Sequence, residues 1–173
     1  SFVNTFLNNY GYLYDYVDGN MIDWSVRPNM IMAAAPDYSP LDQVQKRNVI
    51  DICTRELLTP KGLRSLSPKS GGYTPICVGD KEYRTRVYHQ GTAWPWLGCF
   101  YLEACLKLYK RTRLSFVERQ LIGYEDEVVN HCLGTIPEFF DGNPPFNGRG
   151  AISFAMNVGG VLRTLALLEK YKY

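Results

Sequence analysis

The sequence of 173 residues is poor in the residues that form metal centres and disulfide frameworks. It has only two histidines, His89 and His131, and no H-x-x-x-H or H-E-x-x-H pair, so a histidine-based metal site is not expected. The five cysteines are widely spaced and odd in number, without a C-x-x-C pair, which fits neither a disulfide framework nor a zinc site. We therefore predict reduced, mostly buried thiols, with no metal or other cofactor.

Long apolar runs, a charge excess and the common catalytic motifs are missing as well. No stretch approaches the roughly 18 apolar residues that a membrane span needs, and no charged and then apolar leader opens the chain. Lys and Arg number 19 against 17 Asp and Glu, so no strong field would attract a polyanion. Nucleotide-binding glycine motifs and the G-x-S-x-G motif are absent. We expect a cytoplasmic protein that binds neither nucleic acid nor a membrane.

Aromatic residues are what the sequence has in excess. They make up 14% of the chain, with 13 Tyr and 3 Trp, and the hydrophobic fraction of 46% is enough for the core of one domain over residues 1–173. Tyr and Trp combine a flat apolar face with a polar edge, which suits stacking on the C–H faces of sugars as well as packing in a core. Composition alone leaves both interpretations open.

Helical periodicity alternates with long, turn-rich stretches. We predict helices over 25–35, 39–58, 92–111, 114–134 and 151–172, with a weak helix over 3–10. Ser39 is the expected N-cap of the helix over 39–58, and Ser115 with Glu118 is the expected capping box of the helix over 114–134. The irregular stretches are 11–24, 59–91 and 135–150, with strands limited to local pairing of 76–80 with 83–89. Loops of this length are commonly functional.

The stretch "YRTRVYHQGTAWPW" (83–96) groups several candidate site residues. His89 and Gln90 offer hydrogen-bond donors and acceptors, while Trp94 and Trp96 flank a proline at the start of a helix. The structural interpretation is that the tryptophans belong to the core and that His89 is a hydrogen-bonded structural residue. The functional interpretation is a ligand site, which the clustering of these side chains favours.

The stretch "YDYVDGNMIDWSVRPN" (14–29) adds Asp18, Arg27 and Asn29. Asp18 precedes Gly19 and is also an ordinary turn residue. A guanidinium beside several acids is expected to orient one of them, or to bind a ligand hydroxyl through its planar fork. Surface ion pairing is the alternative interpretation for Arg27.

Glu138 lies in "GTIPEFFDGNPP" (134–145), between a proline and two phenylalanines. One interpretation is a loop carboxylate that accepts backbone N–H groups, with Asp141 and Gly142 forming a plain turn. The other is a general base that faces a substrate from among aromatic side chains. A glycosidase needs two carboxylates, about 6.5 to 9.5 Å apart in an inverting enzyme, and the sequence contains no distances.

Five motifs, in this order and at these separations, resemble the C-terminal amylo-α-1,6-glucosidase domain of glycogen debranching enzymes. They are "YLYDYVDG", "SVRPNMIMA", "LLTPKGLRSLSP", "YHQGTAWPWLGCF" and "IPEFFDGNPP". The resemblance covers nearly the whole chain. Met30 is a departure, because similar sequences have a polar Gln after "RPN", and a polar contact is not expected at this position.

The resemblance implies an all-α fold of (α/α)6 toroid-type helical hairpins around a glucan-binding funnel, with long irregular loops at one rim. Because a complete toroid needs roughly 350 to 400 residues, residues 1–173 are expected to form about half of it, the C-terminal half of the glucosidase domain. The implied activity is inverting hydrolysis of α-1,6-linked glucose at branch points of glycogen or limit dextrin. Glu138 falls where the family places its general base. We expect the general acid, an Asp, outside this chain, and little turnover by the chain alone.

The resemblance also implies substrate contacts and an α-glucan partner, such as glycogen, limit dextrin or a maltooligosaccharide. Residues expected to line or support the terminal glucose site are Tyr88, Trp94 and Trp96. Residues expected to bind sugar hydroxyls or to hold Glu138 in place are Asp18, Arg27, Asn29, His89 and Gln90. Helix faces left uncovered by half a toroid predict self-association. A non-catalytic glucan-binding module and a helical scaffold are the alternative hypotheses.

Overall fold

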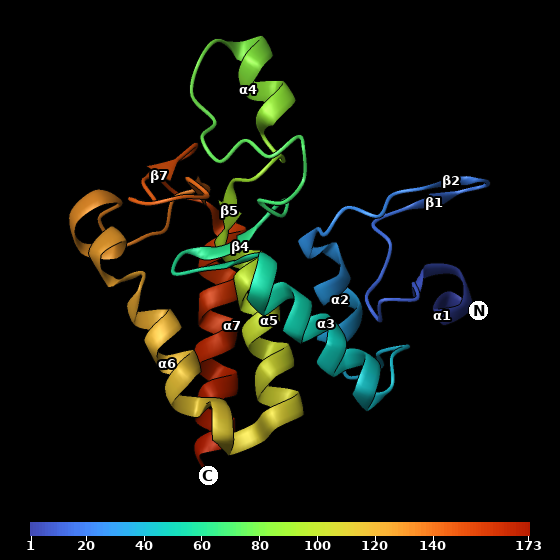
Figure 1. The fold of residues 1–173 in the computed structure, drawn as a ribbon. Coiled ribbons are helices and arrows are strands. Elements are labelled where there is room, and N and C mark those ends of the chain that lie inside the picture. The colour runs from blue at the N-terminus through green and yellow to red at the C-terminus, as the bar shows by residue number, and fades with distance from the viewer.

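A computed structural model describes residues 1–173, and their fold mixes helices with short strands (Figure 1). The prediction of an all-α fold built from (α/α)6 toroid-type hairpins is wrong. The chain is about 50% helical and 10% strand, with one antiparallel sheet of two strands and one of five. The strands are two or three residues long, and β5 pairs on both sides with segments far away in the sequence. Strands this short leave no readable alternation of apolar and polar residues, which is why the sequence did not reveal them.

Most of the predicted helices are present with shorter ends, but two differ more. The helix expected over 114–134 ends at Ile122 and is followed by a separate π-helical turn, and the one expected over 25–35 is a 3-10 turn followed by a four-residue helix. The helical elements are α1 (Phe2–Phe6), η1 (Pro28–Met30), α2 (Ile31–Ala34), α3 (Gln43–Glu56), α4 (Lys81–Val87), α5 (Pro95–Tyr109), η2 (Lys110–Arg113), α6 (Leu114–Ile122), the π-helical turn η3 (Glu127–His131) and α7 (Ala155–Lys172). The segment 83–89, expected to pair as a strand, lies largely in α4, because the Asp80 side chain accepts the Tyr83 N–H and caps a helix there. No helix is long and apolar enough to cross a bilayer.

The five-stranded sheet joins the loop segments that carry the candidate residues. Its strands, in spatial order, are β3 (Leu58–Thr59), β4 (Gly62–Arg64), β5 (Ala93–Trp94), β6 (Phe139–Phe140) and β7 (Gly148–Arg149), and each pairs antiparallel with the next. A separate hairpin is formed by β1 (Val17–Asp18) and β2 (Met21–Ile22). Because Ala93 lies opposite Phe140, the sheet places the stretch around Trp94 beside the one around Glu138.

Helix α5 runs through the centre of the fold and packs against α7, α3 and α2 (Figure 1). Its residues Tyr101, Leu102 and Leu106 are almost fully buried, as expected for a helix that is apolar nearly all round. All five cysteines are free and buried, which confirms the prediction of reduced thiols.

An ion pair between the buried Glu103 and the exposed Arg163 joins α5 to α7. The carboxylate of Glu103 is bound by Arg163 at 2.7 Å and by Lys107 at 2.6 Å. Burial alone would raise the pKa of Glu103, but Arg163 and Lys107 outweigh it and hold the pKa of this carboxyl below its usual value. The pair therefore aligns the two helices that begin at the loop end of the molecule.

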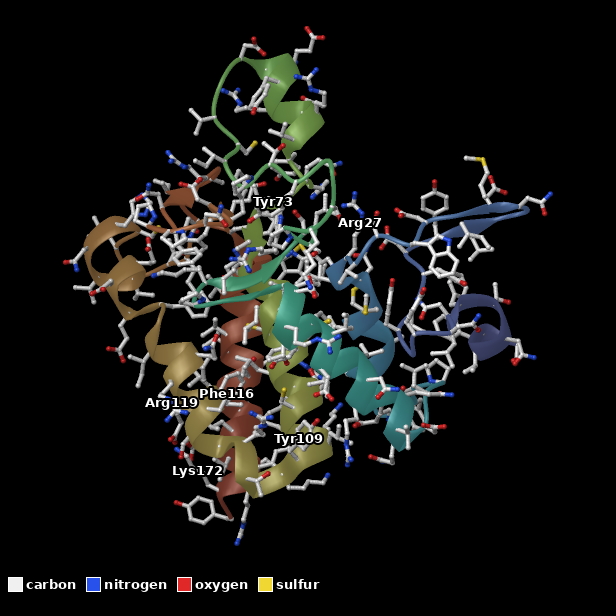
Figure 2. All side chains as sticks on the ribbon, viewed as in Figure 1. Arg27, Tyr73, Tyr109, Phe116, Arg119 and Lys172 are labelled. Carbon is white, nitrogen blue, oxygen red and sulfur yellow. The ribbon has the colours of Figure 1, made fainter.

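The loops gather at one end of the helices. Figure 2 places Arg27 and Tyr73 at this end, and Tyr109, Phe116 and Lys172 at the opposite end. The sheet and α4 lie at the loop end, whereas the C-terminus lies at the other (Figure 1). The candidate residues must therefore be sought at the loop end.

The caps of two helices differ from the predictions. Asp42, and not Ser39, caps α3, in a complete capping box with Gln45. Ser39 instead donates to the Ala33 carbonyl at 2.6 Å and closes the preceding turn. The expected capping box at Ser115 is absent, because the 3-10 turn η2 leads directly into α6 and leaves no extended residue in front of it.

We predict that Asp42→Ala lowers the free energy of unfolding by about 1 kcal/mol, because it removes the acceptor for the Gln45 N–H at the start of α3. Ser115→Ala is the matched control and should stay within about 0.5 kcal/mol of wild type. Urea unfolding followed by circular dichroism measures both. Equal losses in the two variants would contradict the observed assignment of the cap.

Candidate active site

A cavity of about 350 Å³ opens at the loop end of the helices. It is lined by five of the predicted site residues, which are Arg27, Asn29, His89, Trp94 and Trp96. The cavity also has the carboxylate of Asp15, one of the acids near Arg27 in the stretch 14–29. Side chains from three separate stretches of the chain thus meet in one place.

Arg27 holds the polar side of this cavity together. Its guanidinium donates to the carbonyls of His89 at 2.8 Å and Ser65 at 3.2 Å, and to the side-chain oxygen of Gln90 at 3.1 Å. Its Nε lies 3.8 Å from Asp15, whose other oxygen accepts from Asn29 at 2.7 Å. Arg27 is therefore a positioning residue that joins three loops and orients a carboxylate, which is one of the two roles expected from its planar fork.

Aromatic rings form the other side. Trp94, on β5, is 4% exposed, and its ring centroid lies 5.2 Å from that of His89 and 5.1 Å from that of Tyr88. Its indole N–H donates to Thr92. The structural interpretation thus applies to Trp94, which forms a fixed wall, whereas Trp96 is only partly buried and contributes surface to the cavity.

Glu138 lies directly before β6 and is anchored at both carboxylate oxygens. One oxygen accepts the hydroxyl of Tyr88, and the other accepts the N–H of Ala151 at 2.9 Å. The Glu138 N–H donates to the Ala151 carbonyl at 2.8 Å. The side chain is partly exposed, so the anchored carboxylate remains accessible to water.

The buried amide of Asn157 fixes the backbone on which Glu138 is mounted. Asn157 is fully buried in the first turn of α7, and its Nδ2 donates to the carbonyls of Pro137 at 2.6 Å and Glu138 at 2.8 Å. Its Oδ1 accepts the N–H of Trp96 at 3.0 Å, one of the free donors in the first turn of α5. Sequence reasoning missed this residue, because a single Asn at the start of an apolar helix resembles an ordinary polar position.

Gly150 allows the chain to pass close to the Glu138 carboxylate. Its φ of +72° lies in the left-handed region, and an added Cβ would collide with Glu138 Oε2 and lie 2.8 Å from the ring of Phe139. Glycine is thus required here by both conformation and space.

Tyr88 and His89 connect Glu138 with the cavity. Glu138 does not itself line the cavity, but its hydrogen-bond partner Tyr88 lies with its ring centroid 4.5 Å from that of His89, which does. Burial, helped by the bond to Glu138, raises the pKa of Tyr88, so this hydroxyl stays protonated as a donor. Partial burial and the nearby Arg27 lower the pKa of His89, while Glu138 acts in the opposite direction.

Two predicted residues lie elsewhere, and one turn residue has a different role. Asp18 is on the exposed β1–β2 hairpin and is not among the residues that line the cavity. Gln90 reaches the site only through its bond to Arg27. Asp141, which the sequence suggested to be part of a plain turn, is buried. Its two carboxylate oxygens accept hydrogen bonds from Nε and Nη2 of Arg149, at 3.0 and 2.9 Å.

A further group of possible metal ligands lies at η3. Glu127, His131 and Cys132 present ligand atoms within 4.8 Å of one another. Glu127 and His131 belong to the π-helical turn, and Cys132 follows it as the C-cap. The Glu127 carboxylate already binds the Lys61 ammonium at 3.1 Å and His131 at 2.8 Å. Because that ammonium would repel a cation, we assign the group as an ion-pair network.

Comparison with known protein families identifies the family of this chain. The family described as amylo-alpha-1,6-glucosidase matches residues 1–163 of the 173. This chain therefore belongs to the amylo-alpha-1,6-glucosidase family, a family of glycoside hydrolases that act in glycogen debranching. A search of curated proteins finds no match to it.

We predict that Asn157→Ala destabilises the protein by roughly 2–4 kcal/mol, because two carbonyls and one N–H lose their buried partner. Asn157→Asp should be worse, since it places a carboxylate against those two carbonyls. Asn147→Ala, at an exposed asparagine, is the control and should change the free energy of unfolding by less than about 0.5 kcal/mol. Denaturant unfolding measures all three, and a wild-type midpoint for Asn157→Ala would contradict the assigned role.

We also predict that Glu138→Gln lowers the pKa of His89 further, whereas Arg27→Gln raises it, because each substitution removes one charge that acts on the imidazole. Proton NMR titration of the two histidine rings measures this, with His131 as the reference. Since folding favours the neutral form of His89, unfolding takes up a proton, and the contribution of His89 to stability is lost as the pH falls below the ordinary histidine value of 6.5. Identical His89 titration curves in wild type and both variants would refute the proposed coupling.

Proposed function

We propose that this chain forms the C-terminal half of a glucosidase domain that hydrolyses α-1,6-linked glucose at branch points of glycogen or limit dextrin. Glu138 is the general base that activates water, and the mechanism inverts the anomeric centre. The observation that carries the proposal is the carboxylate of a partly exposed glutamate, held at both oxygens by Tyr88 and the Ala151 N–H. It lies beside a cavity lined by aromatic and hydrogen-bonding side chains.

The anchoring of Glu138 suits a general base. A carboxylate has about four lone-pair sites, so the two hydrogen bonds leave acceptor capacity for a water molecule. Proton abstraction requires that water within hydrogen-bond reach in a fixed direction. The bonds from Tyr88 and Ala151 fix the plane of the carboxylate, and Asn157 fixes the backbone behind it.

The cavity suits the terminal glucose of a branch. Trp96, beside the fixed wall formed by Trp94, offers apolar ring surface for the C–H face of the sugar. Asn29, His89 and Asp15 offer polar groups for its hydroxyls. The lowered pKa of His89 favours the neutral imidazole, which presents one donor and one acceptor to hydroxyl groups. Arg27 and Gln90 act on the substrate through the geometry they impose on these neighbours.

The general acid belongs to a part of the parent protein outside this chain. The acidic residue that lines the cavity, Asp15, is engaged by Asn29 and faces Arg27, which suits a carboxylate that binds hydroxyls. An inverting enzyme needs both an acid and a base, so the chain alone should turn over little substrate. The parent enzyme acts in the cytoplasm on α-glucan.

The test replaces Glu138 by Gln in the complete parent protein and measures glucose release from limit dextrin. We predict that kcat falls about 10²–10⁴-fold while KM changes little, because the amide cannot accept the proton but keeps the shape of the side chain. Glu125→Gln, at an exposed glutamate on the same chain, is the matched control and should retain wild-type kcat.

Wild-type turnover by Glu138→Gln would reject the assigned base. If the parent protein bound limit dextrin without releasing glucose, a non-catalytic glucan-binding module would be the better description. The two outcomes separate, because the first concerns one residue and the second the activity of the whole protein.

A further inference from the structure

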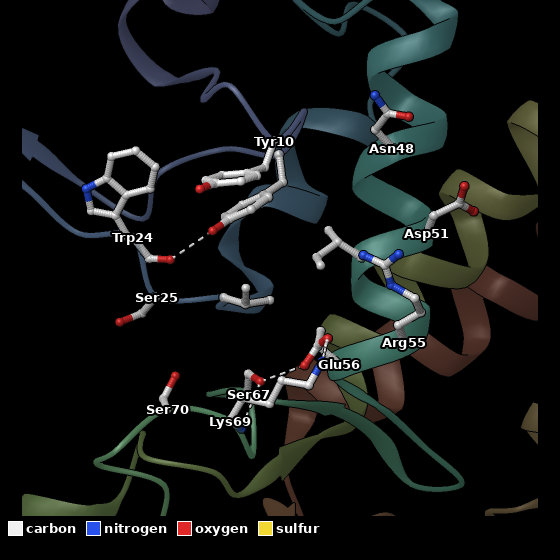
Figure 3. Close-up of a pocket in the computed structure, with 13 residues that line it drawn as sticks. Tyr10, Trp24, Ser25, Asn48, Asp51, Arg55, Glu56, Ser67, Lys69 and Ser70 are labelled. Atoms are coloured by element: carbon white, nitrogen blue, oxygen red, sulfur yellow. Dashed lines mark hydrogen bonds and ion pairs between the residues drawn. The ribbon is translucent and has the colours of Figure 1, made fainter.

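A second hollow of about 570 Å³ lies between the N-terminal aromatic residues and α3 (Figure 3). We name it the α3 groove. It is lined by Tyr10, Tyr12, Trp24, Ser25, Val26, Asn48, Asp51, Ile52, Arg55, Glu56, Ser67, Lys69 and Ser70. It shares no residue with the cavity beside Glu138, although Val26 lines the groove and its neighbour Arg27 lines that cavity. Its volume falls within the range of about 300–1,000 Å³ typical of small-ligand sites.

One wall of the groove is aromatic and open to solvent. Tyr10 is 77% exposed and Trp24 is 47% exposed. The Tyr10 ring stacks on that of Tyr12 with a centroid distance of 6.4 Å. The Trp24 ring packs edge to face with the Tyr10 ring, with a centroid distance of 6.1 Å. Three rings thus stand together, and Tyr10 and Trp24 leave much of their apolar surface open to solvent.

The aromatic wall is held in place by hydrogen bonds. The Asn8 side chain, 5% exposed, accepts the N–H groups of Tyr10 at 2.9 Å and Tyr12 at 3.2 Å. The Tyr12 hydroxyl donates to the carbonyl of Trp24 at 3.2 Å, which joins the two aromatic segments. The rings are therefore mounted on fixed turns, which reduces the entropy lost on binding a ligand.

The facing wall is polar and has unused hydrogen-bonding capacity. Asn48, Asp51 and Arg55 follow one face of α3 at spacings of three and four residues, and their side chains make no hydrogen bond or ion pair within the protein. The deeper Glu56, in contrast, is bound by Ser67 at 2.9 Å and Lys69 at 2.6 Å. The polar groups at the bottom of the groove are therefore hydrogen-bonded within the protein, whereas those of Asn48, Asp51 and Arg55 are free to bind a ligand.

We propose that the α3 groove is a second, non-catalytic site for a linear α-1,4-glucan chain. Flat rings opposite amide, carboxylate and guanidinium groups match a ligand that has C–H faces and hydroxyl edges. The two acids, Asp51 and Glu56, balance Arg55 and Lys69, so the groove favours a neutral ligand over a polyanion. The choice of glucan among neutral oligosaccharides rests on the proposed function.

The test titrates the chain with maltoheptaose and measures binding by isothermal calorimetry. Tyr10→Ala with Trp24→Ala should weaken binding about tenfold or more, because it removes the exposed ring faces. Tyr38→Ala is the matched control, a fully exposed tyrosine outside the groove, and should bind as wild type does. The double variant Asn48→Ala with Asp51→Ala changes helical positions that tolerate alanine, and it should also weaken binding. It keeps the test valid if the aromatic variant misfolds.

A site-specific signal separates the groove from the candidate active site. The indole N–H resonance of Trp24, assigned by its loss in Trp24→Phe, should shift during the titration in wild type and in Glu138→Gln alike. Absence of saturable maltoheptaose binding, an unshifted Trp24 resonance, or wild-type affinity in both groove variants would overturn the proposal. A shifted Trp24 resonance together with full turnover by Glu138→Gln in the parent enzyme would uphold the groove and reject only the assigned base.

Discussion

The side-chain amide of Asn157 is the interaction on which the arrangement of the candidate site depends. A single buried group accepts a free N–H at the start of α5 and donates to two carbonyls of the segment that carries Glu138. Unpaired polar groups at a buried helix end are costly, so the three bonds fix the relative positions of α5, α7 and the catalytic candidate. The ion pair of Glu103 with Arg163 further along the same two helices maintains the alignment that the amide needs.

The sequence predicted helices better than strands, for a physical reason. The apolar stretch of α5 is too long for a strand, and the buried residues of α3 recur at helical spacing, so both helices were evident. The five-stranded sheet is defined by pairs such as Leu63 with Trp94 and Ala93 with Phe140, which are set by tertiary contacts and leave no local pattern. A local sequence motif also gave a wrong prediction. Ser115 and Glu118 have the spacing of a capping box, but η2 leads directly into α6, so no residue there has the extended conformation that an N-cap needs.

The members of the site were more predictable than their roles. Arg27, His89 and Trp94, which the family resemblance assigned to one site, line a single cavity. It did not reveal that Arg27 binds two backbone carbonyls, or that Tyr88 bonds to Glu138, because such contacts depend on how distant loops fold together. For Asp18 the sequence allowed both a turn residue and a ligand-binding residue. In the structure it lies on the exposed β1–β2 hairpin and does not line the cavity.

The two proposed glucan sites share one short piece of backbone. Ser25 and Val26 line the α3 groove, and Arg27 orients the polar side of the cavity beside Glu138. Arg27 is bound by Ser65 and by the adjacent His89 and Gln90, so a shift of this segment on one side would disturb the other. Binding energy from a part of the substrate remote from the reacting bond can be used to orient that bond. If both proposals hold, a glucan chain bound in the α3 groove would help to hold a branch of the same glucan near Glu138. The backbone from Val26 to Arg27 would keep the two sites in a fixed relation.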